Sequence, residues 1–263
     1  MAVMTISTYT VARPGRAEPA AVTVAEAGAG RPFLLLHGGA GPFSFLAFGE
    51  LLARERPARV LTPTHPGWNG TPRPGDLTGI RGLAELYVAL IDQLGLTGVT
   101  VVGNSIGGWI AAELALLASP RVSGVVILNG VGISVPGHPV ADFFALTPAE
   151  LADLSYADPA RFRIDPEAMP DSQRAVMAAN RQAIALFAGT TMADPGLADR
   201  LAAVTVPTCV LWGQSDRIVD PEYGKAYAAA IPGAVHRPLA GTGHLPQLET
   251  PQQTLEAIWD FAR

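Results

Sequence analysis

Short apolar runs alternate along the chain with longer stretches in which apolar residues recur at helical spacing. The runs are apolar throughout, and leucine and β-branched residues dominate them. The clearest runs are residues 33–36, 60–62, 99–102, 122–128 and 206–212. Unbroken runs of this length are typical of parallel strands that helices cover on both faces. Two weaker runs, residues 5–11 and 21–25, suit an antiparallel start to the same sheet.

The stretches between the runs have the period of amphipathic helices. After Thr78 the apolar residues fall on one helical stripe, and Gly95 is placed to end that helix. Near the C-terminal end, Thr250 and Gln253 predict a capping box, with Pro251 at the first helical position. Strand and helix alternating in this way predict an α/β fold with a doubly wound, mostly parallel sheet.

Residues 131–204 break the alternation, because they contain turn signals and helix starts but no convincing strand. The stretch TPAE at 147–150 predicts a second capping box. Three Asp-Pro pairs suit helix starts with aspartate as N-cap: Asp158-Pro159, Asp165-Pro166 and Asp194-Pro195. We interpret residues 131–204 as a helical insertion, a cap or lid, in a core formed by residues 1–130 and 205–263.

Composition narrows the class of protein. The chain has 263 residues, 49% of them hydrophobic, which suits one large α/β domain with a sizeable core. Its net charge is −5 without clustered Lys or Arg, so we expect no nucleic-acid partner. We see no secretory signal, and no apolar run approaches the roughly 20 residues that cross a bilayer. The single cysteine, Cys209, lies in an apolar run and suits a buried, inert thiol. We expect a soluble cytoplasmic protein that does not bind membranes.

The strongest chemical signal is G-N-S-I-G at residues 103–107, where an apolar strand turns directly into an apolar helix. Such a turn strains the central residue, Ser105, and side chains two positions to either side would collide, which accounts for Gly103 and Gly107. The strain projects the hydroxyl above the sheet edge, next to the N-terminus of the following helix. We therefore predict that Ser105 is a nucleophile rather than part of a Gly/Ser turn.

A serine hydroxyl stays protonated near neutral pH, so it needs a base within hydrogen-bond reach. Of the five histidines, His244 lies in a flexible G-T-G-H turn between a short strand near residues 234–239 and the last helix. Such a turn can hold an imidazole over the sheet edge, and we predict His244 as general base. His37 suits a structural hydrogen-bonding role. His65 suits either the wall of the site or loop packing, and His138 and His236 look peripheral.

The third catalytic group should be a carboxylate that orients the histidine. Asp216 follows the run at 206–212, and Asp220 follows shortly after. Because Pro221 and an apparent helix come directly after Asp220, that residue suits an N-cap, and we favour Asp216. The end of the run at 122–128 has Asn129 and no carboxylate. Serine, acid and histidine each follow a predicted strand, at the edge where open α/β sheets place their sites.

A glycine-rich loop at residues 38–41 follows another strand. Acyl transfer develops negative charge on a substrate oxygen, which two aligned backbone amides can stabilise. We predict the amides of Ile106 and Gly39 as this oxyanion hole, with Ala40 as an alternative to Gly39. The chain has no complete G-x-G-x-x-G, no Walker motif and no metal-ligand spacing, so we expect no cofactor and no metal.

These motifs resemble the α/β-hydrolase superfamily across almost the whole chain: His37-Gly38-Gly39, the G-N-S-I-G-G stretch, the turn from Gly213 to Asp216, and Gly243-His244. The resemblance implies the triad Ser105, Asp216 and His244, an oxyanion hole at Gly39 and Ile106, and a helical cap. Serine at the nucleophile position argues against the epoxide hydrolases and haloalkane dehalogenases of this fold.

Two departures from the family pattern bear on the substrate. A typical relative has Asp-x-x-Gly after the third strand, where this chain has His65-Pro-Gly-Trp68. The Gly-Asn-Ser-x-Gly-Gly form is similar to that of carbon–carbon bond hydrolases, but the loop after Gly41-Pro42 lacks the asparagine expected of them.

The expected activity is hydrolysis of a small, largely apolar ester or lactone through an acyl-enzyme. Carbon–carbon cleavage or a lyase reaction by the same triad is an alternative, and a non-catalytic ligand-binding or signalling protein on this fold is another. The residues expected to line the pocket of the small-molecule substrate are His65, Trp68, Trp109, Phe143, Phe144 and Phe187. Each of these taken alone equally suits a core position.

Overall fold

A computed structural model describes residues 4–163 and 168–263. They form an eight-stranded sheet in the order β1-β2-β4-β3-β5-β6-β7-β8. The strands are β1 Thr5–Val11, β2 Ala20–Gly28, β3 Arg31–Leu36, β4 Ala58–Thr64, β5 Val99–Asn104, β6 Val122–Leu128, β7 Thr208–Gly213 and β8 Val235–Leu239. Strand β2 runs antiparallel to β1 and β4, whereas the pairs from β4 to β8 are parallel. The predicted α/β fold, its mostly parallel sheet and its antiparallel start are confirmed.

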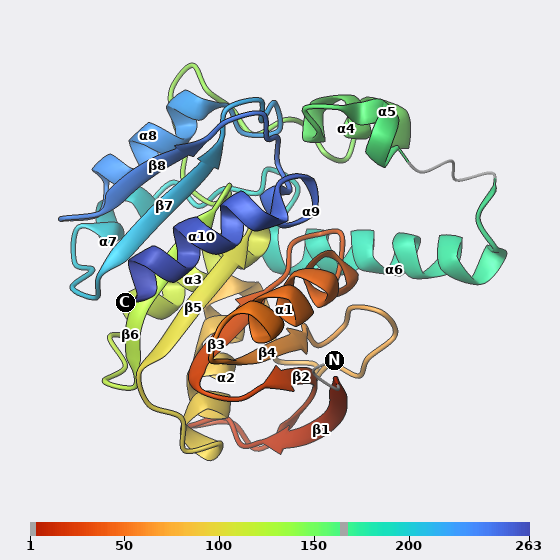
Figure 1. The fold of residues 1–263 in the computed structure, drawn as a ribbon. Coiled ribbons are helices and arrows are strands. Elements are labelled where there is room, and N and C mark those ends of the chain that lie inside the picture. The colour runs from red at the N-terminus through yellow and green to blue at the C-terminus, as the bar shows by residue number, and fades with distance from the viewer. Residues whose placement is uncertain (1–3, 164–167) are drawn as a thin grey trace.

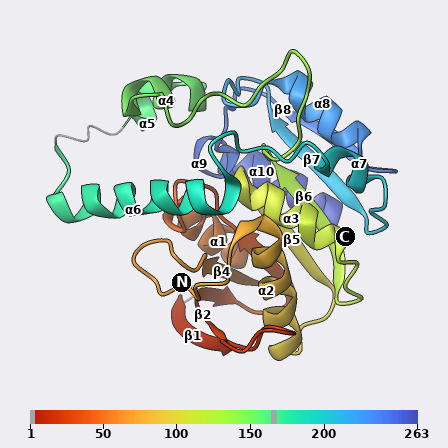
Figure 2. The same cartoon turned by 180° about the vertical axis from the view of Figure 1, so that it is seen from behind.

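Helices cover both faces of the sheet, as Figures 1 and 2 show from opposite sides. The helices of the core are α1 Phe43–Glu55, α2 Gly79–Gln93, α3 Ile106–Leu116, α8 Pro221–Ala229, α9 Pro246–Glu249 and α10 Pro251–Ala262. Helices α1 and α10 bury their apolar faces in one cluster, which includes Phe33, Phe45 and Trp259. Helices α2, α3 and α8 pack on the opposite face in a larger cluster. Burial on both faces explains why the central strands are apolar at successive positions.

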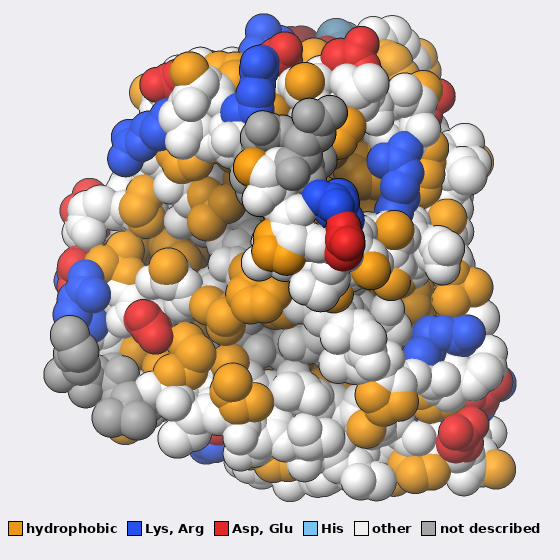
Figure 3. Space-filling model, turned by 90° about the vertical axis from the view of Figure 1, so that its right-hand side faces the viewer, with side chains coloured by type: hydrophobic (Ala, Val, Ile, Leu, Met, Phe, Trp, Pro, Cys, Tyr) orange, Lys and Arg blue, Asp and Glu red, His pale blue; other side chains and the backbone are white. Residues whose placement is uncertain are grey.

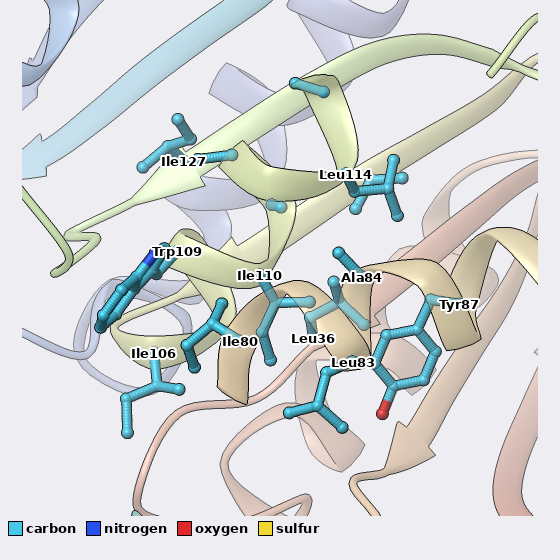
Figure 4. Close-up of a cluster of buried hydrophobic side chains, with 14 of the residues drawn as sticks. Leu36, Ile80, Leu83, Ala84, Tyr87, Ile106, Trp109, Ile110, Leu114 and Ile127 are labelled. Carbon is cyan, nitrogen blue, oxygen red and sulfur yellow. The ribbon is translucent and has the colours of Figure 1, made fainter. Parts of the chain in front are cut away.

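The larger cluster includes Ile106, the first residue of α3 and the one that follows Ser105. Figure 4 shows Leu83 and Tyr87 from α2 pointing toward Ile110 from α3 and Leu36 from β3. All four side chains are at most 1% exposed. The N-terminal half of α3 is thus held by close packing.

Residues between β6 and β7 form helices, and the described ones contribute no strand to the sheet. These helices are α4 Pro148–Ser155, α5 Pro159–Phe162, α6 Asp171–Ala188 and α7 Leu197–Leu201. In Figure 1, α4 and α5 form one arm and α6 another. None of the described helices has both the length and the apolar character that a membrane span requires.

Of the helix starts predicted within residues 131–204, one capping box is confirmed and the Asp-Pro pairs differ in their outcome. The capping box of α4 is confirmed, because Glu150 N donates to Thr147 Oγ1 and Thr147 N donates to Glu150 Oε2. Asp158 is the N-cap residue of α5, but its side chain makes no capping hydrogen bond. Asp194 accepts from Gly196 N in the turn before α7 and is not its N-cap. Asp165-Pro166 lies outside the described residues.

The capping box predicted at the start of α10 is wrong. Thr250 is the N-cap residue, but its side chain makes no capping hydrogen bond. Its hydroxyl lies 2.8 Å from that of Thr242, in the loop that precedes α9. The Thr250 hydroxyl, which the local sequence assigned to capping α10, therefore makes a tertiary contact instead.

We expect Leu83→Ala to lower the free energy of unfolding by about 2–5 kcal/mol, because it removes buried methyl groups from a site that cannot fully collapse. Urea unfolding followed by circular dichroism measures this. Leu186→Ala is the matched control, because Leu186 is 44% exposed and the change should cost less than about 1 kcal/mol. Equal losses for the two variants would contradict the placement of Leu83 in the core.

Candidate active site

Ser105 is the single residue between β5 and α3. Its backbone has φ 56° and ψ −118°, which is strained for a residue with a side chain. A Cβ on Gly103 would lie 1.9 Å from the carbonyl oxygen of Gly107, and a Cβ on Gly107 would lie 1.9 Å from that of Leu36. Both glycines are therefore required by direct backbone contact, and the strained elbow that the motif predicts is present.

The loop after β3 lies directly beside the serine. A Cβ built on Gly38 would come within 3.4 Å of Ser105 Oγ, and one built on Gly39 would come within 2.8 Å of Ile184 Cδ1 from α6. Ile106 is the first residue of α3, and the first amides of a helix have no acceptor within it. The backbone of Gly39 and the amide of Ile106 thus lie on the two segments that flank Ser105. Such an arrangement suits the stabilisation of a developing oxyanion.

Asp216 and His244 are joined by a hydrogen bond. His244 Nδ1 lies 2.8 Å from Asp216 Oδ2, and both residues are buried. Asp216 Oδ1 accepts from the backbone amides of Ile218 and Val219 at 2.8 and 3.1 Å. With Nδ1 donating to the carboxylate, Nε2 carries the free lone pair, which is the tautomer that a general base requires.

Asp220, the competing acid, is engaged elsewhere. Its Oδ1 accepts from Tyr223 N at 3.0 Å, so that it caps α8, and its Oδ2 lies 2.7 Å from His138 Nδ1. Partial burial raises the pKa of Asp220, but the hydrogen bond with His138 and the capping amide together outweigh it, so the pKa lies below its ordinary value. The geometry therefore pairs Asp216, and not Asp220, with His244.

Asn129 is a functional candidate that the sequence interpretation passed over as a position without a carboxylate. Its Nδ2 donates to Asp216 Oδ2 at 2.7 Å, the same oxygen that faces His244, and its Oδ1 accepts from Gly213 N. Asn129 has φ 47°, in the left-handed region where asparagine is favoured over most residues. The sequence signal that could have identified this residue is an asparagine directly after the last residue of a buried strand, at the edge where the site lies.

Asn104 connects the serine elbow to the histidine loop. Its Nδ2 donates to the carbonyl oxygens of Leu128 and His244, at 3.0 and 2.9 Å, and its Oδ1 accepts from Gln247 Nε2 at 3.1 Å. All of these side chains are buried, so each hydrogen bond also satisfies a polar group that water cannot reach. Nothing in the linear sequence pairs Asn104 with Gln247.

His37 and His65 form a buried pair of tilted rings, with centroids 3.7 Å apart and an interplanar angle of 31°. His65 N donates to His37 Nε2, His65 Nε2 lies 2.8 Å from the carbonyl oxygen of His37, and His65 Nδ1 contacts the hydroxyl of Tyr87. Burial lowers the pKa of His65 to about 4, and burial together with the neighbouring His65 lowers the pKa of His37 well below its ordinary value. Both rings are neutral and fully hydrogen-bonded, which fits a packing role for this pair.

The six residues expected to line a pocket fall into two groups. Buried side chains make up the first group: His65, Trp68, Trp109 and Phe187. Within it, the Trp68 ring lies between His65 and Phe187, with centroids 5.3 Å from each. Phe143 and Phe144 are half-buried and lie beside the guanidinium of Arg181 from α6. Figure 3 views the side on which α6 projects, where hydrophobic side chains gather over the middle of the face.

The chain matches the model of the alpha/beta hydrolase family over residues 33–257. It is 28% identical over 226 residues to a 2-hydroxy-6-oxononadienedioate/2-hydroxy-6-oxononatrienedioate hydrolase of Cupriavidus pinatubonensis, covering 77% of this chain and 75% of the relative. It is 30% identical over 251 residues to a 2-hydroxy-6-oxo-6-phenylhexa-2,4-dienoate hydrolase of Burkholderia cepacia, covering 85% of each chain. A thermophilic esterase from Thermogutta terrifontis has a similar structure, with a TM-score of 0.77, 25% identity and 97% of each chain covered.

The fold and the strained elbow define a hydrolase of the α/β class. The match over most of the chain shows that it belongs to the alpha/beta hydrolase family, as the resemblance of its motifs implied.

We expect stability to fall as the pH drops from about 6.5 toward 4, with His65 as one contributor. The folded state keeps His65 neutral down to a pKa of about 4, whereas the unfolded chain binds a proton near the ordinary value of 6.5. Within this window the unfolded state holds more protons, and each such group removes up to about 1.4 kcal/mol per pH unit. Urea unfolding at several pH values should show a shallower decline for His65→Asn. Equal slopes would contradict the assignment.

We expect Asp216→Asn to lower kcat by about three to four orders of magnitude, because an amide at this position no longer holds the required tautomer of His244. Asp220→Asn should change kcat less than about threefold, because asparagine caps helices as well as aspartate and the contact with His138 is only half-buried. Steady-state kinetics on one ester measures both variants. A larger loss for Asp220→Asn would move the acid role to that residue.

Proposed function

We propose that this protein is a serine hydrolase that cleaves a small, largely apolar ester or lactone through an acyl-enzyme. Ser105 is the nucleophile, His244 the general base and Asp216 the acid that orients it. The observation that carries the proposal is the 2.8 Å hydrogen bond between buried Asp216 and His244, on loops at the same sheet edge as the strained Ser105. Strained backbone of this kind clusters at active sites, where the strain can be part of the mechanism.

In the proposed reaction, Ser105 Oγ attacks the substrate carbonyl carbon while His244 Nε2 takes the hydroxyl proton. The amides of Ile106 and Gly39 stabilise the oxyanion of the tetrahedral intermediate. His244 then delivers the proton to the leaving group, and the carbon–oxygen bond breaks to give the acyl-enzyme. Water, deprotonated by His244, releases the acid and restores Ser105. Asp216 stays ionised throughout and stabilises the imidazolium.

Residues 131–204 are proposed as a cap that supplies much of the substrate pocket. Support comes from α6, where Ile184 lies over Gly39 and Phe187 packs on Trp68. These contacts are apolar, and so are most side chains expected to line the pocket. A ligand with a large apolar surface suits such a wall, since its burial removes that surface from water.

Carbon–carbon cleavage by the same triad is the second candidate. It is favoured by the two relatives, whose names are those of dienoate and dienedioate hydrolases. The esterase from Thermogutta terrifontis favours the first candidate. A role as a non-catalytic binding protein would leave the strained serine and the fully hydrogen-bonded Asp216 without a purpose.

We expect the native protein to hydrolyse p-nitrophenyl esters and lactones, and Ser105→Ala to lose at least about a thousandfold in kcat, because removing a triad nucleophile costs several orders of magnitude. A fluorophosphonate probe should label the native chain and spare Ser105→Ala. Turnover of a vinylogous diketone without turnover of any ester would assign carbon–carbon cleavage instead. Failure of the probe to label the native protein would remove nucleophilic catalysis altogether.

A further inference from the structure

The end of helix α4 is bonded to both loops that carry the proposed acid and base. The last carbonyl groups of a helix have no acceptor role within it and need outside donors. Here the carbonyl oxygen of Asp153 accepts from Arg217 Nη2, and that of Leu154 accepts from Arg217 N at 3.1 Å. The carbonyl oxygen of Ser155 accepts from the backbone amide of His244 at 2.6 Å. Residues next to Asp216 and His244 itself thus satisfy the C-terminus of α4.

Glu249 completes this junction from the other side. Its Oε1 accepts from Gly243 N at 2.9 Å, and its Oε2 accepts from Ala157 N at 2.8 Å, so one carboxylate joins the histidine loop to the chain after α4. Gly243 directly precedes His244. A carboxylate that accepts two backbone amides makes charge-assisted hydrogen bonds, which are stronger than neutral ones.

The junction is packed backbone against backbone. A Cβ on Gly243 would lie 2.2 Å from the carbonyl oxygen of Ser155 and 3.0 Å from Glu249 Oε1. A Cβ on Gly213 would lie 2.0 Å from the carbonyl oxygen of Gly243. The acid loop, the histidine loop and the end of α4 therefore have little freedom to shift past one another.

The surroundings of Glu249 disfavour the charged form of its carboxyl group. Partial burial raises its pKa, and the neighbouring negative charge of Asp216 adds to this, while the amides of Ala157 and Gly243 oppose it. The pKa of Tyr156, at the end of α4, is raised by burial and by the negative charge of Glu249. The Glu249 carboxylate is therefore placed near the negative charge of Asp216 at an energetic cost. The two hydrogen bonds that it accepts, from Gly243 N and Ala157 N, offset this cost.

We propose that Glu249 is a positioning residue for His244, acting by joining Gly243 N to Ala157 N so that α4 and the histidine loop are one rigid unit. This inference rests on the proposed function of His244 as general base. Glu249 has no role toward substrate, so its loss should affect kcat and leave KM unchanged. In this proposal the α4 arm of the insertion holds the loops of Asp216 and His244 in place, and the α6 arm forms the pocket wall.

The test compares Glu249→Ala and Glu249→Gln with the native chain, using the rate constant for labelling by a fluorophosphonate probe and kcat and KM for one ester. We expect labelling and kcat to fall about tenfold to a hundredfold in Glu249→Ala, as for loss of charged hydrogen bonds, with KM within twofold. Glutamine keeps one acceptor oxygen, so Glu249→Gln should retain more activity. Circular dichroism and thermal unfolding show that each variant is folded.

Glu150→Ala is the matched control. Glu150 closes the capping box at the other end of α4, so its loss weakens the same helix without touching the histidine loop. We expect labelling of Glu150→Ala at the native rate. An equal loss in both alanine variants would assign the effect to the stability of α4 and overturn the proposal.

The remaining outcomes separate the two proposals. Absence of labelling in the native chain overturns the proposed function. Native labelling together with unchanged rates in folded Glu249 variants overturns the positioning role alone. A Glu249→Gln chain that does not fold would assign Glu249 to stability and would likewise overturn it.

Discussion

Strand β5 turns into helix α3 with Ser105 as the only residue between them, and the rest of the site is arranged around this strained backbone. A residue with φ 56° and ψ −118° costs about 1–3 kcal/mol, so the surrounding structure must hold it in place. The hydrophobic cluster beneath α3 does so, since Ile110 and Leu114 are fixed against α2 and the sheet. Close backbone contacts at Gly103 and Gly107 leave no room for a side chain at either position.

Three polar side chains around the elbow each join separate segments of the chain. Asn104 ties the elbow to the histidine loop, Asn129 ties the end of β6 to Asp216, and Glu249 ties the histidine loop to the insertion. Each of these side chains bonds at least two partners on different segments. In a site from which water is largely excluded, an unpaired polar group would be costly, so a connected network of this kind specifies one arrangement of the loops.

The insertion between β6 and β7 therefore has two physical roles in this proposal. Its α4 arm is bonded to the loops of Asp216 and His244, while its α6 arm places apolar side chains over the glycine loop. A protein named as a dienoate hydrolase is 30% identical to this chain, and a structure of an esterase is 25% identical to it. The proposed triad is compatible with either activity, and in this proposal the α6 arm supplies the pocket wall that would distinguish the substrates.

Local sequence determined the sheet, several helix starts and the serine elbow. Apolar runs, helical periodicity and glycine positions act over a few residues, and each has a direct steric or burial cause. The same local chemistry indicated that Asp220 caps a helix, which left Asp216 as the better acid. The structure shows both the cap and the hydrogen bond of Asp216 to His244.

Only the tertiary structure decided the contacts between distant segments. The hydroxyl of Thr250 meets Thr242 instead of capping α10, and Glu249 meets Ala157, 92 residues away. Side chains such as Trp68 and His65, expected at the pocket, are buried in packing contacts. A polar side chain takes whichever partner the fold brings within about 3 Å, and that choice depends on how the whole chain packs rather than on its immediate neighbours in sequence.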